Sequence, residues 1–392
     1  MAEELIKTRC VILIGDYEQI DVAQQVARFQ RGLQRFAQTW NVRTGCTPAK
    51  MESDGIAVWQ IETKAPNWKV NTEFRLLNWS DVFKDDSRLR NFNRIWRAVR
   101  ALTDFVISGT CWRYLRKSWR FGLFFLYPVL AVLPFIAIAL WLPKLLENLG
   151  VPFASFVGLV IGAGLFAVFV RWVDPALLRV VDMWIVLYDL VHLKRAGLSQ
   201  RLGIFSQDIV AKLRANDFNE IVIIGHGIGA ALQSVIMDRA LFALPDFGKD
   251  GRSVSALSIG SLLLAIALHR GGAWLVSPAL RMARDRMVYW AEYQADEDIL
   301  SFPGCNPVSE FIGESDEPVL QRIRIKDMVD TTAKRRLSKT VYQNHERLVG
   351  ANTKRYFYDY FMVCCGPFAL STRVEYRDLM VKVFGRDGRL AF

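Results

Sequence analysis

Two long apolar runs without a charged residue constrain this chain more than any other feature of its sequence. The first covers residues 121–142 and the second covers residues 151–170. A helix needs about 20 apolar residues to cross a hydrocarbon core roughly 30 Å thick, whereas apolar runs of about 14 residues or fewer are typical of buried core helices. Both runs exceed that length, so we expect each to form a membrane-spanning helix.

The segment between the two runs is short, which predicts a tight helical hairpin. Residues 143–150 contain two charged side chains, Lys144 and Glu147. Gly158 and Gly162 form a small-xxx-small pair that would let the two helices pack closely. Basic residues flank the hairpin on both sides: Arg113, Arg116, Lys117 and Arg120 precede it, and Arg171, Arg179, Lys194 and Arg195 follow it. The positive-inside rule then predicts a two-span membrane protein with both flanks in the cytoplasm and the lipid bilayer as its partner.

The overall composition fits a globular protein with a membrane insertion. Of the 392 residues, 52% are hydrophobic and 23% are charged, and the net charge is +11. A chain of this composition is too apolar for a typical soluble enzyme and too charged for a polytopic transporter. The two properties coexist because the apolar residues are concentrated in two runs. The basic residues are otherwise scattered and no nucleic-acid-binding motif accompanies them, so we expect no nucleic-acid partner. Nothing in the sequence indicates an oligomeric state.

Short β-branched runs alternate with helical patterns on both sides of the hairpin. Strands are predicted at residues 9–14 (RCVILI), 56–62, 69–77, 220–224 (EIVII), 253–259 and 287–293 (MVYWAEY). Helices are predicted at residues 22–40, 90–107 and 230–243, and through most of the tail, residues 331–361. This alternation predicts an α/β fold with a mostly parallel sheet covered by helices on both faces. We expect residues 1–110 and 196–392 to form the two parts of one domain, with residues 111–195 as the inserted hairpin and its flanks.

A glycine-rich turn joins the predicted strand at 220–224 to the helix that follows, in the sequence IVIIGHGIGAAL. The same setting carries the nucleophile elbow, G-x-S-x-G, of α/β-hydrolases. Glycines are needed there because the nucleophile lies in a strained turn with backbone crowded on both sides, and the next N–H helps form the oxyanion hole. Gly225, His226, Ile228 and Gly229 occupy the positions of this motif, but the nucleophile position holds Gly227 instead of Ser.

The same glycines also fit a relaxed dinucleotide fingerprint, Gly225-x-Gly227-x-x-Ala230. That interpretation needs an acidic residue about 20 positions further on, at the end of the next strand, to hold the ribose. The predicted strand at 253–259 is followed by Gly260 and Ser261, and no acid stands there. A glycine-rich turn that carries no site is a further alternative.

The chain resembles the α/β-hydrolase superfamily, in particular bacterial membrane-anchored lipase- and esterase-like proteins with an inserted transmembrane hairpin. Within YQADEDILSF, the resemblance selects Asp298 as the triad acid, with Asp296 as an alternative. It selects His345 as the triad base, which gives the hydrolase order of nucleophile, acid and histidine. It also places Asp16 and Tyr17 where the first oxyanion loop of the family falls. These features imply a bacterial inner-membrane location and an acyl or lipid-like ligand, with no cofactor and no metal.

The other three histidines are predicted to have no catalytic role. His226 belongs to the turn and is expected to point away from residue 227. His269 stands beside Arg270 at the end of a predicted helix, where we expect a capping role. His192 lies among basic residues after the hairpin.

Glycine at position 227 decides which activities remain open. Acyl transfer in this superfamily needs a hydroxyl oxygen within about 3 Å of the histidine. A site that keeps only the oxyanion hole and substrate binding retains about 10³–10⁴-fold of catalysis over water. Three hypotheses follow: a membrane-tethered pseudoenzyme of the hydrolase type, an active hydrolase that uses water activated by His345 or another serine such as Ser261, and a dinucleotide-binding membrane protein.

Overall fold

A mixed, mostly parallel sheet forms the centre of the first of two units into which the chain folds. The computed structural model describes residues 5–17, 20–53, 55–83, 91–169, 171, 176–215, 217–244, 253–284, 288–330 and 341–391. Unit 1 comprises Met1–Arg88, Leu193–Ala267 and Gly271–Phe392, and unit 2 comprises Leu89–His192 and Leu268–Arg270. Unit 2 therefore contains the helix predicted at 90–107 as well as the hairpin.

The sheet of unit 1 follows the strand order β2-β4-β5-β1-β6-β7-β8-β9, and β3 pairs with β4. All neighbouring strands from β5 to β9 are parallel, whereas β2, β3 and β5 each run antiparallel to β4. The strands are β1 (Thr8–Ile14), β2 (Arg43–Cys46), β3 (Lys50–Ser53), β4 (Ile56–Lys64), β5 (Lys69–Leu77), β6 (Glu220–His226), β7 (Ser253–Ile259), β8 (Tyr289–Ala295) and β9 (Val319–Ile323). The predicted α/β class and mostly parallel sheet are confirmed.

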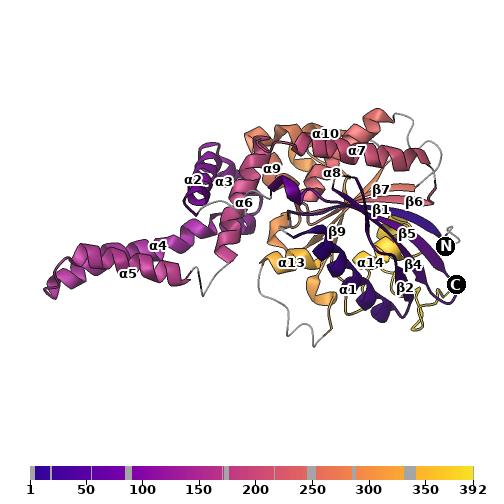
Figure 1. Ribbon diagram of the computed structural model, residues 1–392, viewed down its shortest axis with the longest axis horizontal. Helices are drawn as coiled ribbons and strands as arrows, with labels where there is room; N and C mark the ends of the chain where they lie inside the picture. The colour runs from indigo at the N-terminus through magenta and orange to yellow at the C-terminus, as the bar shows by residue number, and fades with distance from the viewer. Residues whose placement is uncertain are drawn as a thin grey trace. The chain divides into compact units, whose positions relative to one another are not determined.

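Helices cover both faces of this sheet (Figure 1). One face carries α1 (Val22–Trp40) and α14 (Tyr360–Cys365), and the other carries α7 (Leu198–Ala215), α8 (Ile228–Ala243) and α10 (Ala273–Arg284). Shorter helices in the connections are α9 (Leu263–Ala267), α11 (Ser309–Ile312), α13 (Val341–Arg347) and α15 (Leu370–Glu375). The strands at the sheet centre are buried on both faces, which explains why their sequences are continuously apolar instead of alternating.

Aromatic side chains fill the core between α1, α14 and the sheet. Phe29 of α1 packs against Trp59 and Phe74 with ring centroids 5.3 and 4.5 Å apart, and against Phe361 at 5.0 Å. Helix α1 begins at an Asp21 cap that accepts a hydrogen bond from the Gln24 N–H at 2.7 Å. Its apolar residues recur with helical spacing, so a single face of the helix is buried.

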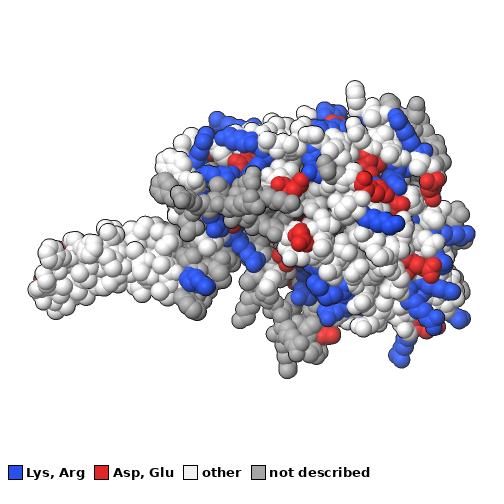
Figure 2. Space-filling model, viewed as in Figure 1, with Lys and Arg blue, Asp and Glu red and all other residues white. Residues whose placement is uncertain are grey.

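Unit 2 is helical and contains the apolar hairpin. Its helices are α2 (Asn91–Ile107), α3 (Thr110–Lys117), α4 (Trp119–Asn148), α5 (Ala154–Val168) and α6 (Ala176–Val191). Helices α4 and α5 pack side by side, and the glycines make the close approach: a Cβ on Gly158 would lie 2.6 Å from Pro143 Cδ, and one on Gly162 would lie 2.9 Å from the Ala139 Cβ. The space-filling view shows the surface of this hairpin almost without charged side chains (Figure 2).

The two apolar helices differ in length. Within the described residues, α4, with 30 residues, is the single helix long and apolar enough to cross a membrane by length and composition, and α5 is a shorter apolar helix of 15 residues. The second run was predicted over residues 151–170, of which residue 170 lies outside the described residues.

Most predicted element boundaries agree with the structure, but the tail does not. Residues 331–340 lie outside the described residues, and α13 and α14 are the helices of the part that follows. The prediction of helix through residues 348–359 is wrong. In this stretch the polar groups bond to other partners: the Thr353 N–H donates to the Met328 carbonyl at 3.0 Å, and Asn352 Nδ2 donates to the Tyr358 carbonyl at 2.7 Å.

Candidate functional site

The turn between β6 and α8 has the crowded geometry that its glycines predict. Gly227 has φ +57° and ψ −119°, a backbone conformation that residues with a side chain adopt only under strain. A Cβ on Gly229 would lie 2.2 Å from the Ile14 carbonyl oxygen, and one on Gly225 would lie 2.4 Å from the Ala230 Cα. The three glycines therefore allow α8 to start directly against the end of β1.

Asp16 fills the space in front of Gly227. A Cβ built on Gly227 would lie 2.3 Å from Asp16 Cγ and 2.4 and 2.6 Å from its two carboxylate oxygens. Asp16 Oδ1 also accepts a hydrogen bond from the Ile228 N–H at 2.7 Å. β1 and β6 are parallel neighbours with Ile14 opposite Gly225, so the residue that follows β1 by two positions reaches the start of α8. The carboxylate thus caps α8, where the helix dipole favours negative charge.

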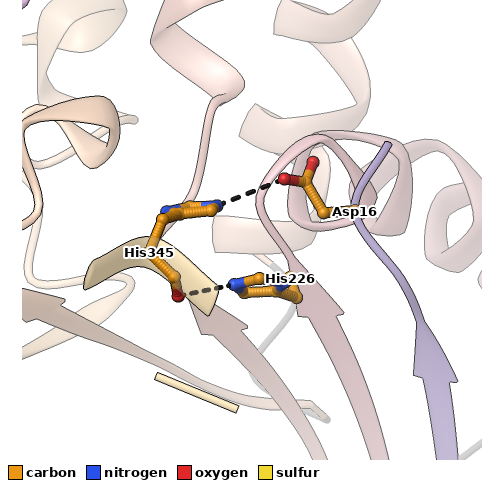
Figure 3. A group of neighbouring side chains, drawn as sticks. All are labelled: Asp16, His226 and His345. Carbon is orange, nitrogen blue, oxygen red and sulfur yellow. Dashed lines mark hydrogen bonds and ion pairs between the residues drawn. The ribbon is translucent and has the colours of Figure 1, made fainter. Parts of the chain in front are cut away.

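His345 lies between two carboxylates. Its Nδ1 donates to Asp298 Oδ2 at 2.8 Å, and its Nε2 lies 3.3 Å from Asp16 Oδ2. The second contact is an ion pair. Asp298 follows β8, and His345 belongs to α13, so three separated parts of the chain meet here. Figure 3 shows the ring of His345 directed at the Asp16 carboxylate.

The structure brings Asp298, rather than Asp296, to the histidine. The side chain of Asp298 is fully buried, and its Oδ1 accepts the Leu300 N–H at 3.2 Å. Asp296 instead pairs with Arg322 at the surface. Of the two acids that the sequence left open, Asp298 is the one in contact with His345.

The two carboxylates hold a proton on His345. Burial alone would lower the pKa of this imidazole, but Asp298 and Asp16 outweigh burial and raise its pKa to about 10. Burial opposes ionisation of Asp16, but the contact with His345 prevails and lowers the pKa of the Asp16 carboxyl below its ordinary range. At neutral pH the site therefore contains an imidazolium between two carboxylates, and an imidazolium has no lone pair to accept a proton.

His226 packs face to face with His345 and does not point at residue 227. The ring centroids are 4.5 Å apart with an interplanar angle of 24°, and His226 Nε2 donates to the His345 backbone carbonyl at 3.2 Å. Burial, helped by the charge of His345, lowers the pKa of His226 to about 4, so this ring is neutral.

Asp16, His226 and His345 are close enough to be considered as metal ligands. A metal ion must lie nearly in the plane of each imidazole, about 2.0–2.1 Å from its nitrogen. Two stacked rings cannot direct their lone pairs at one such point, and His226 Nε2 is already bonded to a carbonyl. The ring arrangement does not fit a metal centre at this position.

Two further residues considered from the sequence have local roles in the structure. The Ser261 hydroxyl accepts the Leu263 N–H at 3.2 Å and caps the start of α9. Tyr17 packs its ring edge-on against Phe83 with centroids 5.0 Å apart.

Sequence reasoning placed Asp16 near an oxyanion loop but missed its position against Gly227 and His345. The available signal was indirect: an acid two residues after a buried strand, together with a glycine where the motif has serine. Comparison of the chain with family models, curated proteins and solved structures found no match.

Proposed function

We propose that this chain is a membrane-anchored protein of the α/β-hydrolase type that binds an acyl or lipid-like ligand and has no serine-hydrolase activity. The observation that carries the proposal is the position of Asp16, whose carboxylate fills the space of the missing serine side chain and bonds to the Ile228 N–H. The order of glycine turn, acid and histidine supports the hydrolase-type assignment.

Two chemical steps of acyl transfer are blocked by this arrangement. The substrate carbonyl oxygen needs free N–H donors where negative charge develops, but the Ile228 N–H already bonds to a carboxylate. General base catalysis needs a neutral imidazole, but His345 is held protonated between Asp16 and Asp298. The same protonation disfavours the alternative in which His345 activates a water molecule.

A cavity in unit 1 supports binding of an amphipathic ligand. Its volume is about 340 Å³, within the usual range for small-molecule pockets. Its wall includes Glu346, the residue after His345. Apolar side chains such as Phe29, Trp59 and Phe74 form much of the rest, and α1 contributes three arginines, Arg28, Arg31 and Arg35. An apolar chain with an anionic head group matches these side chains.

The exposure of α4 supports membrane anchoring. Only 11% of its most apolar 18 residues are buried, whereas the core helix of a soluble protein would be mostly buried. Three prolines, Pro128, Pro134 and Pro143, lie inside the helix, a feature that membrane helices tolerate. The bilayer is the partner that this composition favours.

A dinucleotide site fits the geometry poorly. A bound pyrophosphate would need the N-terminus of α8. The Asp16 carboxylate occupies that position and would repel a phosphate. Directly after β7, where a Rossmann fold has its ribose-binding acid, this chain has Gly260, and a Cβ there would lie 2.9 Å from both Asp298 Oδ2 and His345 Cε1.

The experiment is a p-nitrophenyl ester assay on the full chain purified in detergent. Wild type and Gly227→Ser are expected to show the same low turnover as His345→Ala, because wild type and Gly227→Ser both keep Asp16 in the site. The double variant Asp16→Ala/Gly227→Ser is expected to gain turnover that disappears when His345→Ala is added. Wild-type turnover that depends on His345 would overturn the loss of activity. An inactive but folded double variant would overturn the hydrolase-type assignment.

A further inference from the structure

Three side chains of metal-binding type converge in unit 2. Asp104 lies on α2, His192 directly follows α6, and His269 belongs to the segment Leu268–Arg270. Asp104 Oδ2 is 2.9 Å from His192 Nε2 and 3.0 Å from His269 Nε2. The ligand atoms of all three residues lie within 4.8 Å of one another.

Ion pairs link α2 to α6 along the two helices, and this cluster lies at the end of the series. Arg94 pairs with Asp182, and Arg97 pairs with Asp189, each at 2.6 Å. In both pairs an arginine of α2 faces an acid of α6. The series ends at Asp104 and His192, where the acid is on α2 and its partner is an imidazole. An imidazole binds transition metals and a guanidinium does not.

The orientation of the two rings fits a shared metal ion. His192 and His269 have ring centroids 5.4 Å apart and an interplanar angle of 74°. Two imidazoles on one tetrahedral ion, each with a metal–nitrogen distance of about 2.0–2.1 Å, place their centroids about 5 Å apart. The rings of His226 and His345 are stacked instead, with centroids 4.5 Å apart and an interplanar angle of 24°, so their nitrogens do not point at one common ion.

The burial of the three side chains also suits a bound ion. The His269 side chain is 3% exposed, whereas Asp104 and His192 are each 31% exposed, which leaves the ion a path from solvent.

We infer that Asp104, His192 and His269 bind one divalent transition-metal ion of the Zn²⁺ class. Two imidazole nitrogens and one carboxylate oxygen match the ligand preference of Zn²⁺, whereas Mg²⁺ and Ca²⁺ prefer oxygen ligands alone. The ion would hold the segment Leu268–Arg270 against α2 and α6 within unit 2. Three protein ligands leave coordination positions for water.

The test uses the full chain, purified in detergent and stripped of metal. Zn²⁺ is titrated in competition with a chromophoric chelator, and thermal stability is measured with and without Zn²⁺. We expect one Zn²⁺ per chain and a higher Tm when it is bound, because the ion stabilises the folded form. His192→Gln and Asp104→Asn are expected to weaken binding at least about tenfold and to remove the increase in Tm.

Two control variants locate the ion. Asp182→Asn removes a carboxylate of the same helix pair and is expected to leave Zn²⁺ affinity unchanged. His345→Gln alters the cluster of Asp16, His226 and His345 in unit 1 and is also expected to leave Zn²⁺ affinity unchanged. The inference is overturned if wild type shows no stoichiometric binding, if His192→Gln binds as tightly as wild type, or if binding depends on His345 instead. Co²⁺ added to wild type should give the intense visible absorption of a low-coordinate site, and the weak spectrum of the hydrated ion would also overturn it.

Discussion

The carboxylate of Asp16 takes the place that a side chain at Gly227 would need, with 2.3 Å between Asp16 Cγ and a Cβ built on the glycine. The relationship joins the end of β1 to the start of α8, which are more than 200 residues apart in the sequence. It makes the absence of serine part of a packed arrangement, because a serine and this aspartate cannot both keep their positions.

Gly227→Ser is therefore expected to destabilise the protein by about 2–3 kcal/mol, through overpacking and a strained backbone conformation. Thermal unfolding in detergent measures the effect. The matched control is Gly15→Ser in the neighbouring turn, where an added Cβ meets nothing within 4 Å. Adding Asp16→Gly to Gly227→Ser should recover part of the loss. Equal stability of the two serine variants would contradict the packing argument.

The stability of the protein is expected to fall as the pH rises above neutral. The pKa of His345 is raised from its ordinary 6.5 to about 10 in the folded state. A raised pKa contributes stability that is fully present below about pH 6.5 and is lost as the pH rises through about 10. The Tm of wild type should therefore drop between pH 7 and pH 10 by more than the Tm of His345→Gln. Identical pH dependence in the two proteins would show that His345 is not held protonated.

Close packing of α4 and α5 is expected to be sensitive to single methyl groups. Gly158→Ala places a Cβ 2.6 Å from Pro143 and should cost about 1–3 kcal/mol. Gly164→Ala on the same helix meets nothing within 4 Å and should be neutral or stabilising by up to about 1 kcal/mol, because alanine favours helix. Comparison of their Tm values in detergent checks the prediction, and a Gly158→Ala variant as stable as Gly164→Ala would contradict it.

Membrane anchoring predicts that the wild-type chain stays in the membrane pellet after alkaline carbonate extraction. Leu133 and Leu140 are exposed on α4, at 51% and 65%. Replacing both with Lys should release the chain, since each charge near the centre of a membrane helix costs about 2.5–3.5 kcal/mol on insertion. Replacing both with Ala keeps the helix apolar and is the control. A wild-type chain that is extracted by carbonate and soluble without detergent would contradict the anchor.

Much of the fold follows from local sequence patterns. The predicted helix at 22–40 has the bounds of α1, and the strand predicted at 253–259 has the bounds of β7. The spacing of apolar residues sets the bounds of these two elements, because α1 is buried on one face and β7 on both. The tail was mispredicted because residues 348–359 form hydrogen bonds outside the helical pattern, such as the bond from the Thr353 N–H to the Met328 carbonyl, and helical propensity does not reveal them.

The sequence by itself determined the apolar hairpin runs, the alternation of strands and helices, and the strained glycine turn at Gly227, because each depends on the periodicity or conformational range of neighbouring residues. Only the tertiary structure decided that Asp298 rather than Asp296 meets His345, that Asp16 fills the space at Gly227, and that Asp104, His192 and His269 converge. These contacts depend on strand order, register and helix packing across long stretches of chain. Such relations set where a side chain lies in space, and no local pattern encodes them.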